Sequence, residues 1–513
     1  MGGCIKKPSK PKVCDLITIS TVSSSVKLTS RDYLGIHEAF DFIKYIGQGQ
    51  YGIVRLAFRK SQPQAKHFAI KSILKQNIHK HRQILKRELE ILTFTDHPNI
   101  VKLYETYEDH LYLHLVLEYC SGGDIFDRVV EKGSLCEAEA AGILKQLLSA
   151  VNYLHLNKIT HRDLKPDNFL YEDRGSDVIK ICDFGMSIKS DYLKMKSLAG
   201  TPYYLAPEVL KGNYTKACDI WSLGVFMHFL LTGKHPFKGS SVESVYIQAS
   251  GGHEHINMSK LEVSENAKNL LKSMLTVKEH KRITAKNALK HPWFDDLTKT
   301  SMISSSVFNS LRNYRAKNKL WQEAMKVIVK SLSNKQIEDL RNAFLNIDSE
   351  NTGYITAQDL HRAMNQHGMS IPTEEVDVII RNISAPQEGK IKYSDFLVAT
   401  LCRKEVMNEQ LMWEAFQVFD IGNTGRIHKV DLENALNAAG CNFTEDEFNG
   451  LIGEAKLDAE ESIDFLGFKM ILECFEEHSV SRELGSEKIT IIRKLTKDFK
   501  IQLERYNSAL NNY

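Results

Sequence analysis

The residues best suited to chemistry stand in one run of eight, His161 to Asn168, with the sequence HRDLKPDN. The run offers a carboxylate at Asp163, an ammonium two residues later at Lys165, and a side-chain amide at its end. Twenty residues after Asp163, Asp183 opens a DFG tripeptide and supplies a second hard oxygen ligand. Phosphoryl transfer needs a positioned hydroxyl, neutralised charge and oxygen ligands for Mg²⁺ more than it needs covalent help. The run therefore indicates phosphoryl transfer.

A glycine-rich run lies upstream, with Gly47, Gly49 and Gly52 in the pattern G-x-G-x-x-G-x-V that ends at Val54. Glycines let backbone amides approach phosphate oxygens where a Cβ atom would clash. A strand follows the run, whereas a helix would follow it in a dinucleotide-binding fold. Taken alone, the pattern is equally compatible with a tight hairpin that holds no ligand.

Lys71 ends a strongly apolar strand, Phe68-Ala69-Ile70-Lys71. A bare buried ammonium is costly, so this lysine needs partners. Phosphate groups and a carboxylate on the following helix would supply them. Glu88 is the better candidate for that carboxylate; Glu90 is the alternative, but on a helix it lies about 200° around the axis from Glu88.

These groups must be held by elements that the hydrophobic pattern also predicts. Strand-like runs cover residues 41–47, 51–58 and 67–74, and a helical stretch follows them. A buried strand at residues 111–119 comes next, and helical periodicity then dominates to residue 294. The pattern predicts a small β-rich lobe followed by a larger helical lobe.

With Ala206-Pro207-Glu208 downstream, the motifs stand in the order that defines the eukaryotic protein kinases, and residues 40–294 resemble that family. The resemblance implies an α+β bilobal kinase fold, with ATP and Mg²⁺ as cofactors and proteins as substrates. It gives catalytic roles to Asp163, Lys165, Lys71 and Glu88, and magnesium ligation to Asn168 and Asp183. It places the nucleotide against Gly47, Gly49, Gly52, Val54, Ala69, Lys71, Leu117, Glu118, Cys120 and Asp124.

The same resemblance extends to substrate class and control. The HRD run with Lys165, and the sequence GTPYY at residues 200–204, resemble the serine/threonine branch. Asp124 and Asp167 stand where basophilic members recognise an arginine upstream of the target hydroxyl, although they can equally be plain surface acids. Ser197, nine residues before Ala206, is a candidate activating phosphosite.

Composition excludes several other classes. In 513 residues, 42% are hydrophobic and 26% charged, which rules out general disorder and fibrous sequences. No apolar run reaches the ~18 residues of a membrane helix. The nine cysteines form no C-x-x-C pair, so we expect reduced thiols and a cytosolic protein. A net charge of +3 makes a nucleic-acid partner unexpected.

The small net charge conceals an acidic segment. Residues 333–470 contain 12 lysines and arginines against 24 aspartates and glutamates, a net charge of −12 that leaves +15 for the rest. This segment alternates helices with short loops four times, at intervals of ~35 residues. On charge alone, it is either a module that attracts cations or docks on a basic surface, or a solvated acidic face.

The four units resemble EF-hands, and their pairing resembles that of calmodulin. The first loop fits the twelve-residue template best, with Gly353 at the turn. Its predicted calcium ligands are Asp348, Glu350, Thr352, Tyr354 through its carbonyl, Thr356 and Asp359. Position 12 is one methylene shorter than the usual glutamate, which predicts weakened affinity.

The other three loops have lost more ligands. Residues 384–395 have Ser384 and Pro386 where aspartates are expected, and residues 420–431 have Gly422 at position 3. Residues 456–467 begin with lysine and end with glycine, so we expect that loop to hold no metal. Six phenylalanines are expected to keep the helices packed despite this loss: Phe344, Phe396, Phe416, Phe419, Phe448 and Phe468.

A kinase domain followed by a junction and four EF-hands resembles the calcium-dependent protein kinases of plants and protists. The predicted boundaries are a basic arm (1–39), the kinase domain (40–294), the junction (295–332), two EF-hand pairs (333–400 and 401–475) and an amphipathic tail (476–513). The junction is read as a linker carrying one basic amphipathic helix, which the resemblance makes autoinhibitory and a partner of the acidic module. Two alternatives stay open: a kinase with a calcium-insensitive, structural EF-hand module controlled by partner binding or phosphorylation, and a non-catalytic scaffold.

The N-terminus resembles a dual-acylation arm, with Gly2 for myristate and Cys4 for palmitate. Residues 1–30 add five lysines against one aspartate, and a basic patch of this kind strengthens a lipid anchor. Lys6 departs from the expected Ser or Thr. We expect a protein anchored at the cytoplasmic side of a membrane, and otherwise cytoplasmic.

Overall fold

The computed structural model describes residues 35–48, 52–60, 66–189, 195, 202–239, 241–295, 303–314, 319–332, 334–369, 371–384, 388–401, 409–420, 424–438 and 462–473. Residues up to Tyr314 together with Leu332–Leu401 form one compact unit. Arg315–Ser331 and the chain from Cys402 onward form a second unit. Gly2, Cys4, Gly49, Ser197, Phe448 and the predicted tail lie outside the described residues.

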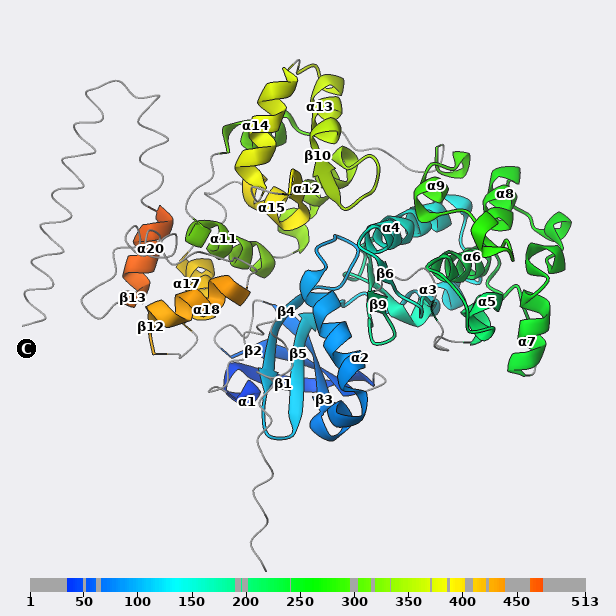
Figure 1. Cartoon of the computed structure of the whole chain (residues 1–513), viewed down its shortest axis with the longest axis horizontal. Helices are drawn as coiled ribbons and strands as arrows, with labels where there is room; N and C mark the ends of the chain where they lie inside the picture. The colour runs from blue at the N-terminus through cyan, green and yellow to red at the C-terminus, as the bar shows by residue number, and fades with distance from the viewer. Residues whose placement is uncertain are drawn as a thin grey trace, which may run out of the picture. The chain divides into compact units, whose positions relative to one another are not determined.

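The first unit opens with a five-stranded antiparallel sheet of strand order β1-β2-β3-β5-β4 (Figure 1). Its elements are α1 (Ile36–Ala39), β1 (Phe40–Gln48), β2 (Gly52–Arg59), β3 (His67–Leu74), α2 (Lys75–Phe94), β4 (Leu103–Glu108) and β5 (Tyr112–Glu118). Phe40, Phe68 and Tyr107 pack edge-to-face within its smaller core. The predicted β-rich lobe is confirmed.

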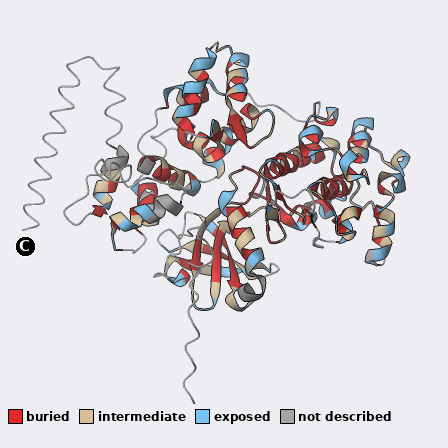
Figure 2. Ribbon diagram, viewed as in Figure 1, coloured by how far each residue is buried: buried red, intermediate tan, exposed pale blue. Residues whose placement is uncertain are grey.

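The helical lobe that follows is built around two buried helices, α4 (Glu137–Leu156) and α6 (Ala217–Thr232). Both are buried along most of their length (Figure 2). The sequence of α6 is apolar on nearly every side, as expected of a helix surrounded by protein. The surrounding elements are α3 (Ile125–Lys132), β6 (Ile159–Thr160), β7 (Phe169–Tyr171), β8 (Ile179–Ile181), β9 (Ile188–Lys189), α5 (Pro207–Leu210), α7 (Val242–Ala249), α8 (Glu265–Met274) and α9 (Ala285–Leu289).

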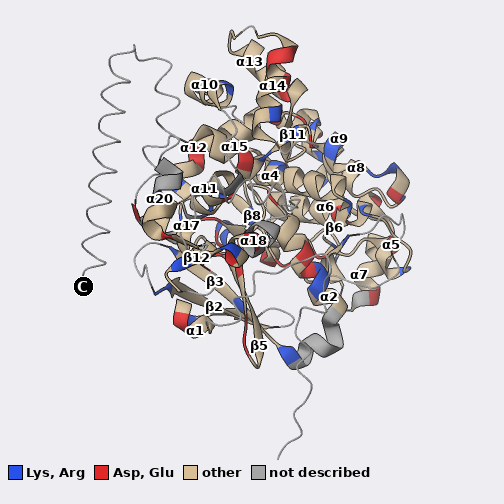
Figure 3. Cartoon of the chain, turned by 60° about the vertical axis from the view of Figure 1, so that its left-hand side comes forward, with Lys and Arg blue, Asp and Glu red and all other residues tan. Residues whose placement is uncertain are grey.

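A pair of helix–loop–helix units completes the first unit. It comprises α12 (Asn334–Ile347), β10 (Tyr354–Thr356), α13 (Ala357–Gln366), α14 (Thr373–Ile383), β11 (Lys390–Lys392) and α15 (Tyr393–Thr400). The two loops pair as short antiparallel strands with Ile355 opposite Ile391. Gly353 and Gly389 adopt φ values of 76° and 60°, which glycine tolerates best, so the turn predicted at Gly353 is confirmed. Acidic residues mark α13 and α14 in Figure 3.

The second unit repeats this arrangement with α17 (Glu409–Phe419), β12 (Arg426–His428), α18 (Lys429–Ala438), β13 (Ser462–Asp464) and α20 (Phe465–Glu473). Ile427 pairs with Ile463 across the two loops. Phe416, Phe419 and Phe468 are buried and in ring contact, as the sequence predicted.

The prediction of one junction helix is wrong: the described part of this segment contains two. α10 (Ser305–Asn313) buries Phe308 and Leu311 and packs against α14 and α15 of the first pair. α11 (Lys319–Ser331) buries Trp321 and Ile328 and packs against α17 of the second pair. The three- and four-residue spacing of apolar residues correctly indicated helix in both segments. It could not indicate that the apolar face of α10 packs on the first EF-hand pair and that of α11 on the second.

Candidate active site

The candidate catalytic loop brings Asp163, Lys165 and Asn168 together. The Lys165 ammonium lies 2.9 Å from the Asp163 carboxylate. The amide Nδ2 of Asn168 donates to the backbone oxygen of Asp163 at 2.7 Å and to its carboxylate at 3.2 Å. The donating face of the amide is thereby used within the loop, and its Oδ1 atom is left as the oxygen donor suited to a cation.

Asp219 of α6 holds the first residues of the loop through hydrogen bonds. It is a fully buried carboxylate that the sequence did not lead us to identify. It accepts hydrogen bonds from the backbone N–H groups of His161 at 3.0 Å and Arg162 at 2.9 Å, and it pairs with His155 at 2.8 Å. Arg162 adopts a φ of 72°, a conformation that needs such support. The only available signal was a charged residue inside an otherwise apolar helix.

Lys71, Glu88 and Asp183 form a second cluster. The Lys71 ammonium lies 2.6 Å from Glu88 and 3.3 Å from Asp183. Burial lowers the pKa of Lys71, but the two carboxylates outweigh it and leave the pKa raised. Burial also disfavours the charged form of Asp183 and so raises its pKa. Lys71 and the Gly185 N–H stabilise that charge more strongly, and the pKa of Asp183 is lowered overall. Both groups are therefore charged at neutral pH.

The helix-phase argument is confirmed by the two glutamates of α2. Glu88 is 2% exposed and faces Lys71. Glu90 is half-buried and lies 3.7 Å from Lys86 instead.

Asp183 is set in place by its own backbone and by the next residue. It has a φ of 58°, and its carboxylate accepts the N–H of Gly185 at 3.3 Å. Phe184 is 1% exposed and packs its ring on His161 at 5.0 Å. The DFG tripeptide is thereby joined to the catalytic loop.

The strand register brings together most of the residues predicted to contact the nucleotide. Gly47 of β1 pairs with Val54 of β2, and Val54 pairs with Lys71 of β3. Ala69 of β3 pairs with Leu117 of β5. These positions therefore lie across neighbouring strands of the same sheet.

Three further predicted contacts lie in or after β5. Glu118 and Cys120 are buried, and the Glu118 side chain is directed to the buried Lys180. Asp124 caps α3 by accepting the N–H of Asp127 at 3.0 Å. This capping gives Asp124 a structural role that the sequence prediction did not include.

The donor set fits ATP and Mg²⁺. Asp183 offers a carboxylate and Asn168 an amide oxygen, both hard ligands of the kind Mg²⁺ prefers. Their backbones are joined, since the N–H of Cys182 donates to the oxygen of Asn168 at 3.0 Å. Lys71 supplies a positive charge fixed by Glu88.

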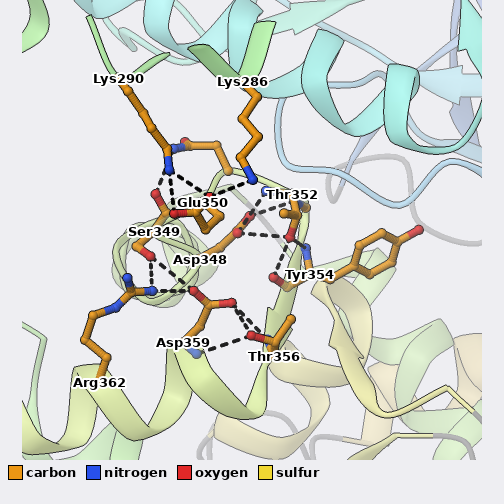
Figure 4. Close-up of polar contacts among 12 residues, drawn as sticks. Lys286, Lys290, Asp348, Ser349, Glu350, Thr352, Tyr354, Thr356, Asp359 and Arg362 are labelled. Carbon is orange, nitrogen blue, oxygen red and sulfur yellow. Dashed lines mark hydrogen bonds and ion pairs between the residues drawn. The ribbon is translucent and has the colours of Figure 1, made fainter. Parts of the chain in front are cut away.

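The first EF-hand-like loop is organised around Asp348 (Figure 4). Its carboxylate accepts the backbone N–H groups of Thr352 at 2.9 Å and Gly353 at 2.7 Å. Burial raises the pKa of Asp348 to about 7 despite these bonds. Tyr354, predicted to ligate through its carbonyl, instead receives the Thr352 hydroxyl there at 2.9 Å.

The other two acidic residues predicted as calcium ligands are paired with lysine and arginine side chains of the protein. Glu350 is paired with Lys290 at 2.8 Å and Lys286 at 3.1 Å, both from the helical lobe (Figure 4). Asp359 is paired with Arg362 at 2.5 Å and accepts the Thr356 hydroxyl at 2.6 Å. Within the described residues no three His, Cys, Asp or Glu side chains are grouped as a metal site. The ligand types fit Ca²⁺, but in this arrangement Glu350 and Asp359 face protein cations.

In the same described part of the chain, no helix combines the length and apolar character needed to cross a membrane.

Comparison with known proteins agrees with this geometry. A model of the protein kinase domain matches residues 40–294, and a model of an EF-hand domain pair matches residues 337–400. Fold, site and these matches define a protein kinase that carries EF-hands.

Full-length relatives narrow the class. The chain is 36% identical over 437 residues to calcium-dependent protein kinase 3 of Plasmodium berghei (strain Anka), which covers 82% of this chain and 78% of the relative. It is 34% identical over 470 residues to calcium-dependent protein kinase 19 of Arabidopsis thaliana, which covers 90% and 85%. The chain belongs to the calcium-dependent protein kinases. It is a serine/threonine kinase that transfers the γ-phosphate of ATP to proteins and is regulated by calcium.

Proposed function

We propose that the two clusters described above carry the transfer. Asp163 orients the hydroxyl of the substrate and accepts its proton, and Lys165 neutralises charge on the transferring group. Lys71, fixed by Glu88, holds the nucleotide phosphates. Bound Mg²⁺ would neutralise phosphate charge, with Asn168 and Asp183 as its oxygen ligands.

The observation that carries this proposal is the buried Lys71–Glu88 pair, 2.6 Å apart, with Asp183 within reach of the same ammonium. The experiment is a comparison of Glu88→Gln and Glu90→Gln. The first should raise the KM for ATP because Lys71 loses its anchor, and the second should leave it unchanged. Equal effects would contradict the assignment.

We propose a preference for arginine upstream of the phosphorylated residue. Asp167 is exposed in the catalytic loop. Asp124 uses one of its carboxylate oxygens, Oδ1, to cap α3. A peptide library scanned with wild type and with Asp167→Asn tests this preference. Loss of arginine selection in the variant supports the proposal, and a wild type with no basic preference refutes it.

We propose the loop from Asp348 to Asp359 as a calcium site. The support is its loop geometry: the N–H groups of Thr352 and Gly353 already orient the Asp348 carboxylate. Calorimetric titration of the full chain with Ca²⁺, compared with Asp348→Ala, tests it. Loss of one binding event is expected, and unchanged stoichiometry would place calcium elsewhere.

We propose that the junction couples the EF-hand pairs to kinase activity. The exposed Arg312 of α10 pairs with Glu375 of α14 at 2.6 Å, and Phe308 packs its ring on His367 at 5.2 Å. Phe308→Ala should therefore loosen α10 and change the calcium concentration for half-maximal activity. An unchanged calcium response would argue against this coupling.

We propose that the N-terminal arm is acylated at Gly2 and Cys4 and holds the kinase at the cytoplasmic face of a membrane. The support is the sequence MGGC followed by lysines, because two anchoring signals are needed for stable binding. Gly2→Ala should move the protein to the soluble fraction, and Cys4→Ser should weaken membrane association. Unchanged partitioning of Gly2→Ala would dispose of the idea.

A further inference from the structure

Four buried charged side chains form a continuous chain from the first EF-hand pair to the end of β5. Arg341 of α12 lies 2.7 and 2.8 Å from the two carboxylate oxygens of Glu172. Lys180 of β8 lies 3.1 Å from Glu172 and 3.1 Å from Glu118. The signs alternate along the chain, so each charge faces an opposite one.

Nearly the whole surface of each of these side chains is covered by protein. Their exposed fractions are only 2–3%. A buried charge that loses its partner is strongly destabilising, whereas removal of a whole pair is tolerated much better. Without Arg341, Glu172 would keep only its contact with Lys180, which Lys180 shares with Glu118. The kinase lobe therefore depends on a residue of the EF-hand pair to pair the buried Glu172.

The network touches the backbone segments that carry the proposed nucleotide and magnesium contacts. Glu118 ends β5, where nucleotide contacts were predicted. Glu172 follows β7, which begins directly after Asn168, and its backbone oxygen accepts the N–H of Ser121 at 3.0 Å. Lys180 stands three residues before Asp183. A shift of any of these segments would move a ligand of the site.

A second side chain of the same EF-hand pair closes the network. Tyr393, 1% exposed at the start of α15, lies over the ammonium of Lys102 at 5.4 Å from the ring centre. The backbone N–H of Lys102 donates to the Glu118 carboxylate at 3.2 Å. The EF-hand pair thus contacts the charged group at two places, through Arg341 at Glu172 and through Tyr393 at Lys102, and contributes to its burial.

We propose that Arg341 is a positioning residue for the magnesium–nucleotide site, supplied to the kinase lobe by the first EF-hand pair. It acts through Glu172 and Lys180 on the segments that carry Asn168, Asp183 and the β5 end. The proposal rests on the nucleotide and magnesium ligands proposed above.

The test measures binding of AMP-PNP with MgCl₂, and steady-state kinetics, in the full chain and in Arg341→Met. We expect about tenfold weaker binding and a similar rise in the KM for Mg·ATP, the low end of what loss of an outer-shell partner costs a metal site. The KM for a peptide substrate should not change. The matched control is Arg381→Met, an exposed arginine on α14 of the same pair whose Nε donates to the backbone oxygen of Asp377 on its own helix at 3.2 Å.

Two further variants separate positioning from mere docking. Arg341→Lys restores one cation and should recover part of the nucleotide affinity. The double variant Arg341→Met/Glu172→Gln removes the pair together and should bind AMP-PNP more tightly than Arg341→Met, because no buried carboxylate has then lost its arginine partner. If Arg341→Met does not fold, the double variant compared with Glu172→Gln carries the same test.

The proposal is overturned if Arg341→Met lowers only thermal stability or the calcium response and leaves nucleotide and magnesium binding at the wild-type value. Equal effects in Arg381→Met would overturn it as well. Failure of the underlying ligand assignment is distinguishable, because it would appear in Asp183→Asn, whose magnesium dependence would then match the wild type.

Discussion

Replacement of Lys286 and Lys290 by glutamine should tighten calcium binding at the first EF-hand loop. Both lysines pair with Glu350, the proposed calcium ligand at position 3 of the loop, at distances of 2.8 to 3.1 Å. Glu350 must leave these partners before it can face a cation at the loop centre. The lysines and calcium therefore compete for one carboxylate, and removal of one competitor favours the other.

The size of the effect follows from exposure. The Lys286 and Lys290 side chains are 54% and 53% exposed, so each ion pair is worth ~0.2–1 kcal/mol. Together they oppose calcium by about 0.5–2 kcal/mol, which corresponds to a ~2- to 30-fold gain in affinity for the double variant. A larger gain would require buried pairs, which these are not.

The assay is calorimetric titration of the full chain with CaCl₂ at physiological salt, repeated at high salt. Because exposed pairs are screened by salt, the difference between the variant and the wild type should shrink at high ionic strength. The matched control is Lys278→Gln/Lys281→Gln, which makes the same change of net charge with two exposed lysines nearby.

Two results would refute the reasoning. An affinity equal to that of the wild type would mean that the lysines do not hold Glu350 in solution. An equal gain in the control would mean that net charge alone sets the affinity. The gain should also vanish when Asp348→Ala is added, since both changes act on the same loop.

Three further outcomes are expected from the kinase lobe. Asp163→Asn should lower kcat by about 10²–10⁴, measured by kinetics, because it removes the proposed proton acceptor. AMP-PNP binding, measured by calorimetry, should change far less, because Lys71 and its partner Glu88 are left in place. Gly52→Ala should lower the unfolding free energy by ~1–3 kcal/mol in chemical denaturation, since its Cβ would lie 2.3 Å from the Ser72 oxygen, whereas Gly47→Ala meets no atom within 4 Å and should be neutral. Burial raises the pKa of Glu118, but Lys180 and neighbouring cations outweigh it and bring the pKa to about 2 from an ordinary 4.5. The resulting stability, about 3 kcal/mol, is present above pH 4.5 and lost as pH falls toward 2. In Lys180→Met, the unfolding free energy should fall less steeply with pH across that window than in the wild type. An equally steep fall in both proteins would contradict the pairing of Lys180 with Glu118.

The sequence was most informative where a residue violated its local pattern. A lysine at the end of an apolar strand demanded a buried partner, and the helix period selected Glu88 over Glu90, which the structure confirms. The turn glycine of the first EF-hand loop, Gly353, was equally readable, because it satisfies a backbone requirement within a dozen residues. Local constraints of this kind leave few alternatives.

Partners far apart in sequence were not readable. Arg341 looked like any polar residue of an amphipathic helix, and its partner Glu172 lies 169 positions away. The acidic surplus of residues 333–470 indicated a docking module or a cation site but could not say which lysines would meet it. Glu350 was predicted as a calcium ligand from its place in the loop, but its pairing with Lys290 depends on how two folded parts pack. The sequence shows which residues are charged, but tertiary packing decides which of them pair.

The two sets of ion pairs between the first EF-hand pair and the kinase lobe differ in how easily they can be broken. The Arg341–Glu172 pair is 2–3% exposed, so salt screens it much less than an exposed pair, and its loss would leave a buried charge without its partner. The pairs of Glu350 are weak, exposed and made by a residue of the calcium loop itself. Since calcium can compete only with contacts that water and salt also weaken, the calcium-responsive end of this interface is expected at Glu350. The Arg341 end then stays in place and keeps the nucleotide site aligned while the loop changes its ligand, which predicts that salt alters calcium affinity without altering the affinity for AMP-PNP.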